Sequence, residues 1–230
     1  MKALFKKVTK AVLFENGIFP PLLSKLFHIL WYYYSYTWQK NTFLGYPIKQ
    51  CPFDLHLYQE LIFKVRPAAV IQTGVSEGGS VIYFASLLDL IGLDPETIVV
   101  GIDIQLSEKA KTLHHPRVRL IEGNSIDPEV VRYTKSLLKE RTGFVSLDSS
   151  HAKEHVLAEL NVYKDFVTVG SYMVVEDTNI NGRPVLPFFG PGPYEAVEDF
   201  LRMDDHFVRD DCWQRNKFSF HQGGWLKRVR

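Results

Sequence analysis

Two short apolar runs that each end in acidic residues constrain the fold more than any other feature of the sequence. Tyr172–Val175 shows no alternation of apolar and polar residues, and Glu176 and Asp177 follow it directly. Phe144–Leu147 is a second short, mostly apolar run, and Asp148 follows it directly. Short apolar runs without clear alternation are typical of strands buried on both faces of a parallel sheet. The sequence therefore predicts an α/β fold with acids at the carboxyl ends of two strands.

These three acids are the candidate metal ligands. If the two strands are neighbours, their ends lie roughly 5 Å apart, so Asp148, Glu176 and Asp177 crowd into one small volume. Like charges raise one another's pKa, and a hard divalent cation held by oxygen ligands relieves that repulsion. The alternative is that one of the acids caps the helix that follows. The spacing favours the metal.

A glycine-rich turn follows the first predicted strand, which covers residues 68–72. The turn at residues 73–80 reads TGVSEGGS and leads into a predicted helix at residues 81–90. This arrangement favours a nucleotide-type ligand, because glycines allow close backbone approach and a helix start offers free N–H groups. The spacing matches neither the dinucleotide fingerprint nor the phosphate-binding loop. Glycines that only turn the chain are an equally good explanation.

Asp103 ends the second predicted strand, which covers residues 97–103. An acid at this strand end suits the hydroxyl pair of a ribose. A helix cap or a solvated loop acid would be the better interpretation of an isolated aspartate. Because Asp103 follows the glycine-rich turn in the chain, we favour the ribose.

The composition is that of an ordinary globular protein. The 230 residues are 46% apolar, enough for one α/β domain with an extension. A net charge of +1 gives no field that would favour nucleic acid. Two cysteines, Cys51 and Cys212, fit a reducing compartment, so we expect a cytoplasmic location without a disulfide framework or zinc cluster.

The first 40 residues differ from the rest. Residues 1–14 are basic and amphipathic, but they lack the apolar centre and cleavage site of a signal peptide. Residues 23–38 are apolar and aromatic, yet too short and too polar to cross a membrane. Peripheral membrane contact and a dimer contact are open alternatives to the favoured interpretation, one or two packing helices broken at Pro20-Pro21. The rings of residues 31–38 favour an interface or the rim of a pocket.

Strands and helices alternate along the remaining chain. Further strands are expected within residues 118–125, 144–147 and 172–175, and two more within residues 207–220. Further helices are expected at residues 55–64, 128–140, 153–163 and 194–203. Residues 41–54 are predicted to be an extended loop, and residues 225–230 a basic tail. A nucleoside site beside a metal site suggests methyl transfer from S-adenosylmethionine to an oxygen, because a hydroxyl must lose its proton and be held in line with the methyl group.

The sequence also resembles a known family, the cephalosporin hydroxylase and rhamnosyl O-methyltransferase family of class I methyltransferases. The resemblance runs from about residue 30 onward, in motifs that include NTFLGYP at 41–47, PFDL at 52–55, GIDI at 101–104, IEGNS at 121–125, LDSSH at 147–151, VVEDTN at 174–179 and GWL at 224–226. It implies a Rossmann-like methyltransferase fold, mostly parallel with helices on both faces, at residues 55–230. Residues 1–54 are then expected to form an N-terminal helical extension and loop. It also implies Mg²⁺ on Asp148, Glu176 and Asp177.

The resemblance implies S-adenosylmethionine as the methyl donor. We predict that it contacts Gln72, Thr73, Gly74, Ser80, Asp103 and Ser125. Two positions depart from the family pattern, which usually has Glu at position 72 and a second Asp at position 150. Gln72 can form hydrogen bonds with a ligand, but it cannot neutralise the amino group of the methionine moiety.

His151 is the candidate catalytic base. It follows Asp148 by three residues, and a histidine titrates near neutral pH and can accept a hydroxyl proton. The alternative is a structural histidine that bonds backbone at a helix start.

Three functions remain open from the sequence. The leading one is Mg²⁺-dependent O-methylation of a small-molecule hydroxyl, on a sugar or secondary metabolite, by a homo-oligomer that binds no nucleic acid. A cephalosporin-hydroxylase-like monooxygenase component is weaker, because non-haem iron sites favour two histidines and one carboxylate. A non-catalytic S-adenosylmethionine-binding partner protein is the third, and Gln72 and Ser150 support it.

Overall fold

The computed structural model describes residues 17, 19–215 and 217–230. The basic segment at residues 1–14, for which the sequence predicts an amphipathic character, lies outside the described residues. Among the described residues, no helix has the length and apolar character needed to cross a membrane.

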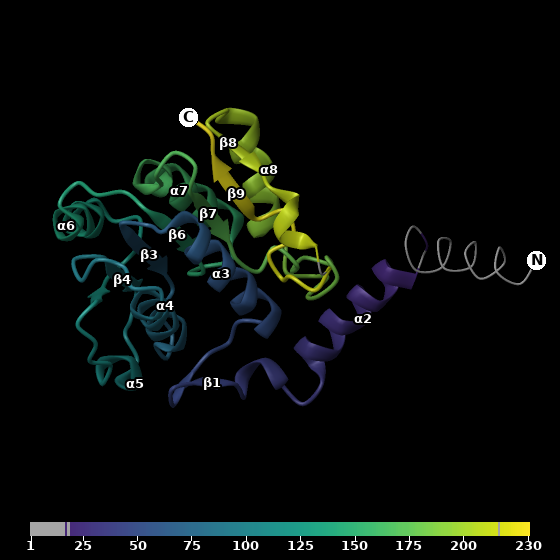
Figure 1. Ribbon diagram of the computed structural model, residues 1–230. Coiled ribbons are helices and arrows are strands. Elements are labelled where there is room, and N and C mark those ends of the chain that lie inside the picture. Colours follow the sequence, from purple (N-terminus) through teal and green to yellow (C-terminus); the bar gives the residue numbers. More distant parts are fainter. Residues whose placement is uncertain (1–16, 18, 216) are drawn as a thin grey trace, which may run out of the picture.

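A seven-stranded sheet forms the centre of the molecule (Figure 1). Its strands, in spatial order, are β5 (Val118–Glu122), β4 (Ile98–Asp103), β3 (Ala69–Thr73), β6 (Phe144–Leu147), β7 (Tyr172–Val175), β9 (Trp225–Arg228) and β8 (Phe207–Arg209). The strands from β5 to β7 are parallel, and β9 runs antiparallel to both of its neighbours. The strand order reverses between β3 and β6, which is where doubly wound sheets bind ligands.

Helices cover both faces of this sheet. One face carries α3 (Pro52–Val65), α4 (Gly79–Leu90), α5 (Glu108–Lys111) and the 3₁₀ helix η4 (Asp211–Gln214); the other carries α6 (Pro128–Leu138), α7 (Lys153–Tyr163), η3 (Lys164–Phe166) and α8 (Pro193–Met203). Successive strand residues point to opposite faces, so Val174 belongs to the first core and Met173 to the second. The predicted α/β fold with strands buried on both faces is confirmed.

The N-terminal part contains α2 (Phe19–Tyr33), η2 (Thr37–Gln39) and a small hairpin of β1 (Thr42–Phe43) and β2 (Tyr46–Pro47). The expected helix break at Pro20-Pro21 can be compared only on its C-terminal side, because residues 1–16 lie outside the described residues; there a helix begins at Phe19. Both prolines stand in the first turn of α2, where a missing N–H costs no hydrogen bond. The loop expected at residues 41–54 is wrong in part, because it holds the hairpin and the first turn of α3.

The C-terminal end differs from the sequence expectation. Two strands were expected within residues 207–220. Among the residues of that range that the structure describes, β8 is the one strand, and the second strand is β9, in the expected basic tail. β9 forms because its backbone pairs with β7, with Leu226 opposite Met173. The side chains of Trp225 and Leu226 are fully buried, one in each core.

Gly74 allows β3 and β6 to end side by side. Its backbone has φ +79°, and a Cβ at this position would overlap the carbonyl oxygen of Asp148. Gly170 has a similar φ of +88° but open space around it. Of these two turns, only the one at Gly74 depends on the absence of a side chain as well as on the left-handed backbone.

We expect Gly74→Ala to lower the free energy of unfolding by about 3 kcal/mol or more, because strain adds to a displaced strand end. Gly170→Ala, the matched control, should cost only the left-handed backbone strain, about 1–2 kcal/mol. Urea denaturation with comparable m values measures both. Equal losses would show that the strand ends separate without cost.

Candidate active site

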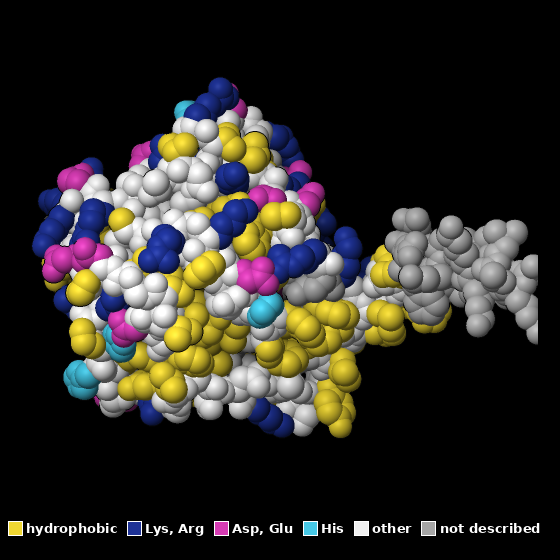
Figure 2. Space-filling model, viewed as in Figure 1, with side chains coloured by type: hydrophobic (Ala, Val, Ile, Leu, Met, Phe, Trp, Pro, Cys, Tyr) yellow, Lys and Arg dark blue, Asp and Glu magenta, His cyan; other side chains and the backbone are white. Residues whose placement is uncertain are grey.

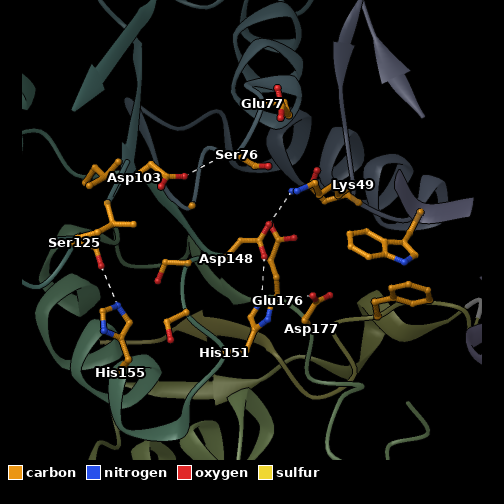
Figure 3. A pocket seen from close by; sticks show the side chains of 18 of the residues that line it. Lys49, Ser76, Glu77, Asp103, Ser125, Asp148, His151, His155, Glu176 and Asp177 are labelled. Carbon is orange, nitrogen blue, oxygen red and sulfur yellow. Dashed lines mark hydrogen bonds and ion pairs between the residues drawn. The ribbon is translucent and has the colours of Figure 1, made fainter. Parts of the chain in front are cut away.

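A cavity of about 670 Å³ lies at the carboxyl ends of the parallel strands. Figure 3 shows its side chains converging from the loops after β3 to β7 and from the N-terminal segment. Its volume is typical of a small-molecule site. The position is the one predicted from the sequence, at the edge where the two acid-ending strands stop.

The cavity brings most of the predicted site residues together. Those that line it are Gly74, Asp103, Ser125, Asp148, His151, Glu176 and Asp177. Gln72, Thr73 and Ser80 do not line it. Gln72 and Thr73 are buried within β3, and Nε2 of Gln72 donates to the carbonyl of Gly74 at 3.1 Å and to Oγ of Ser80 at 2.6 Å. Gln72 and Ser80 thus link the glycine-rich turn to the start of α4. A direct ligand contact from Gln72, Thr73 or Ser80 stays a prediction.

Asp103 joins the glycine-rich turn to the end of β4. Its Oδ2 accepts hydrogen bonds from the backbone N–H groups of Val75 at 2.8 Å and Ser76 at 2.9 Å. Its Oδ1 accepts from the N–H of Gln105 at 3.1 Å. The acid predicted to hold a ribose therefore also fixes the shape of the cavity wall.

We expect Asp103→Ala to lower the free energy of unfolding by about 1–3 kcal/mol, because three backbone donors lose their acceptor. Asp103→Asn should lose less, since its amide oxygen still accepts. Chemical denaturation of the two variants compares these losses. Equal stability of Asp103→Ala and the wild type would mean that water replaces the carboxylate at no cost.

Ser125 lines the cavity, but its hydroxyl is engaged. It donates to Oε1 of Glu159 at 2.6 Å, and Ser149 donates to the same oxygen at 2.7 Å. Nε2 of His155 lies 3.2 Å from the Ser125 oxygen (Figure 3). Glu159 is fully buried on α7. The loop after β5 is thus fixed to α7 beneath the cavity.

A group of acids and one histidine that could hold a metal lies at the ends of β6 and β7, which are adjacent as the sequence predicts. Nε2 of His151 lies 3.5 Å from Oδ1 of Asp148 and 3.5 Å from Oδ2 of Asp177. One ligand atom of each lies within 4.8 Å of the others. Asp177 has φ +52°, a left-handed backbone that aspartate adopts more readily than most residues. Gln50 donates to the second oxygen of Asp148 at 3.2 Å.

Glu176 lies deeper, and only 2% of its surface is exposed. Its Oε1 accepts from the hydroxyls of Tyr58 at 2.8 Å and Ser146 at 2.5 Å. Its Oε2 lies 3.4 Å from Nε2 of His221, whose Nδ1 accepts from the N–H of Asp177 at 3.2 Å. The three residues whose ligand atoms lie close enough together to bind a metal are therefore Asp148, His151 and Asp177. The sequence prediction had Glu176 in place of His151, and Glu176 lies deeper in the protein.

Burial and neighbouring negative charge together shift the pKa values in this cluster. Burial raises the pKa of Asp148 to about 6, and the charge of Asp177 adds to this rise. Burial likewise raises the pKa of Glu176 to about 8, with the charge of Asp148 adding. Burial alone would lower the pKa of His151, but the bond to Asp148 and the charge of Asp177 outweigh it, and the pKa rises to about 9.

Each of these shifts favours bound protons, which bring positive charge into the cluster. A hard divalent cation brings the same charge, and carboxylate oxygens are its preferred ligands. The donor set and its electrostatics therefore fit such an ion.

The N-terminal segment supplies an aromatic wall that the sequence indicated only in general terms. Tyr32 and Trp38 are stacked with ring centroids 5.7 Å apart, and both line the cavity. Nζ of Lys49 lies 5.9 Å from the centre of the Trp38 ring. Phe220 lines the same cavity. The prediction that rings of residues 31–38 form the rim of a pocket is confirmed for these two.

The geometry can now be compared with known proteins. The family model described as rhamnosyl O-methyltransferase/CmcI matches residues 34–229. A rhamnosyl O-methyltransferase of Mycobacterium tuberculosis is 38% identical over 195 residues, which are 83% of this chain and 78% of that protein. A rhamnosyl O-methyltransferase of Mycobacterium leprae is 35% identical over 192 residues, 83% of each chain.

Solved structures agree in fold. A structure of CmcI described with Mg and SAM has a TM-score of 0.62 at 20% identity, covering 84% of this chain and 78% of that one. The apo structure of a TDP-rhamnose 3'-O-methyltransferase of calicheamicin biosynthesis has a TM-score of 0.51 at 20% identity, covering 68% and 72%. The expected Rossmann-like methyltransferase fold is confirmed. Because the family model covers most of the sequence and the curated relatives exceed a third in identity, this chain belongs to the rhamnosyl O-methyltransferase/CmcI family.

Proposed function

We propose that this protein transfers a methyl group from S-adenosylmethionine to a hydroxyl of a sugar or secondary metabolite, with Mg²⁺ held at Asp148, Glu176 and Asp177. One observation carries the proposal: the glycine-rich turn and the acid cluster share one cavity, in a chain of this family. The donor supplies the methyl group, and a divalent ion lowers the pKa of a hydroxyl at its site.

Different walls of the cavity serve the two reactants. Gly74, Asp103 and Ser125 form the wall after β3, β4 and β5, where nucleosides bind in doubly wound folds. Tyr32, Trp38 and Lys49 from the N-terminal segment form the acceptor side. Ring faces suit a ligand with one apolar face and polar edges, as a sugar has. Relatives described as acting on rhamnosyl groups or TDP-rhamnose support a sugar acceptor.

The two alternative functions have less support. The cluster at β6 and β7 has one histidine among its acids, whereas non-haem iron oxygenases favour two. The non-catalytic alternative depended on Gln72 and Ser150. Gln72 does not line the cavity, so the replacement of Glu by Gln at this position removes no charge from the cavity wall. The relatives are described as methyltransferases.

The proposed function predicts methyl transfer from labelled S-adenosylmethionine to a panel of rhamnosides, measured by mass spectrometry. A chelator should abolish transfer and added Mg²⁺ should restore it, because the acids then hold no cation. Asp177→Asn should remove most activity.

Asp199→Asn is the matched control for that variant, since Asp199 pairs with Lys153 and Arg202 on the surface of α8. It should keep wild-type activity. Full activity in excess chelator would remove the metal from the proposal, and an absence of S-adenosylmethionine binding by calorimetry would overturn it altogether.

His151 is the proposed base. It lies beside both acids, close to any hydroxyl that the cluster orients. A base must be deprotonated to act, so the rate should rise with pH through its pKa. That pKa is about 9 without a cation, and a cation on Asp148 and Asp177 would move it down towards the ordinary value of about 6.5.

We expect His151→Ala to lower kcat by about 10²–10⁴-fold and to remove the rising limb of the pH–rate profile. His155→Ala is the matched control, because His155, in the first turn of α7 four residues after His151, also lines the cavity but contacts Ser125 and Glu159. It should keep the limb at saturating S-adenosylmethionine. If the Mg²⁺ affinity of His151→Ala falls together with the rate, His151 is a metal ligand and the base assignment fails.

Other parts of the sequence prediction stay predictions. These are the homo-oligomer, the cytoplasmic location and the domain boundary between residues 54 and 55.

A further inference from the structure

Helix α2 has apolar side chains on two opposite sides. Its inner side, with Phe27, His28 and Trp31, packs on the loop that carries Phe220; the ring centroids of His28 and Phe220 are 4.6 Å apart. Helices that are apolar all round are normally buried. In α2, only the inner side is packed against the rest of the protein.

The outer side of α2 is exposed to solvent. Leu22, Leu26, Ile29, Leu30 and Tyr33 follow one another at helical spacing, which puts them on one side of the helix. Leu26 is 51% exposed and Leu30 is 57% exposed. Figure 2 shows hydrophobic side chains gathered along α2 and beside it. Contiguous apolar patches of this kind mark an interaction site.

A loop from the other end of the sequence enlarges this surface. The N–H of Leu186 donates to the hydroxyl of Tyr33 at 2.9 Å, which fixes the loop to the end of α2. Two residues further on, the side chain of Phe188 is 98% exposed. Tyr34 and Tyr36 are also exposed at this end. Tyrosine rings are enriched where a protein meets the headgroup layer of a membrane.

The charges of the segment distinguish a lipid surface from a second copy of the chain. Residues 1–40 contain six lysines and a single acid, Glu15, although the whole chain has a net charge of only +1. A two-fold dimer through this surface would pair two copies of the same patch, and therefore charges of the same sign. Anionic lipid headgroups offer the opposite charge.

We propose that the outer side of α2, together with the loop at Phe188, docks this protein on an anionic lipid bilayer. α2 has 15 residues, too few to span the hydrocarbon core, so it lies in the plane of the interface. Tyr32 of the same helix lines the cavity. Docking therefore brings the wall of the cavity that α2 supplies close to the lipid surface. The inference is independent of the proposed methyl transfer.

Vesicle co-sedimentation of the full-length protein tests this inference. Vesicles of phosphatidylcholine alone are compared with vesicles that contain about one third phosphatidylglycerol. The wild type should bind the anionic vesicles, and salt should weaken binding. The triple variant Leu22→Ser, Leu26→Ser, Leu30→Ser should bind at least about tenfold more weakly, because it loses the apolar contact.

The matched control is the triple variant Leu90→Ser, Val169→Ser, Met203→Ser, which removes exposed apolar side chains elsewhere on the surface. It should bind like the wild type. A second variant, in which Lys2, Lys6, Lys7 and Lys10 become Gln, should lose the preference for anionic vesicles, and it tests the inference even if the leucine variant misfolds.

Two outcomes would overturn the inference. One is unchanged vesicle binding in both the leucine and the lysine variants. The other is a wild type that ignores vesicles but self-associates in analytical ultracentrifugation, with the leucine variant monomeric, which would assign the surface to a second copy of this chain.

Discussion

The parallel pairing of β6 with β7 is the constraint on which the site depends. It places the residues that follow each strand at the same edge, so Asp148 lies close to Glu176 and Asp177. Hydrogen bonds and an ion pair from surrounding residues then reduce the repulsion between these carboxylates. Tyr58 and Ser146 donate to Glu176, Gln50 donates to Asp148, and His151 lies between the two aspartates. The acid cluster needs a proton or a cation because the strand order brings its carboxylates together.

The same pairing explains why glycine is required at the end of β3. β6 lies between β3 and β7, so Asp148 is fixed on one side by the acids and on the other by the backbone at Gly74. The two halves of the cavity, glycine-rich turn and acid cluster, therefore meet at a single peptide group. A shift in either would move the other, which links the shape of the donor wall to the geometry of the acids.

The sequence predicted the features that depend on residues close together in the chain. Apolar runs located the five parallel strands, and the residues that follow them identified Asp103, Asp148, Glu176 and Asp177 at the cavity. It did not predict Tyr58, Gln50 or His221, because these reach the acids from segments far away in the chain and no local pattern marks them. It also placed Gln72 and Ser80 at the ligand, although alternation along β3 and the first turn of α4 bury them. Strand β9 was missed for a related reason, since only its partner β7 makes it a strand.

The direction of the pKa shifts gives the metal-free protein a definite response to pH. Asp148, Glu176 and His151 all have pKa values raised by the fold, to about 6, 8 and 9. A group with a raised pKa binds its proton more tightly in the folded state, so it stabilises at low pH and loses that contribution as the pH rises through the folded value. Without a cation, stability contributed by this cluster therefore declines from about pH 4 to pH 9. A bound divalent ion competes with those same protons. Its stabilising effect must grow over the interval in which the protons leave, so proton and metal are alternative solutions to the charge that strand pairing creates.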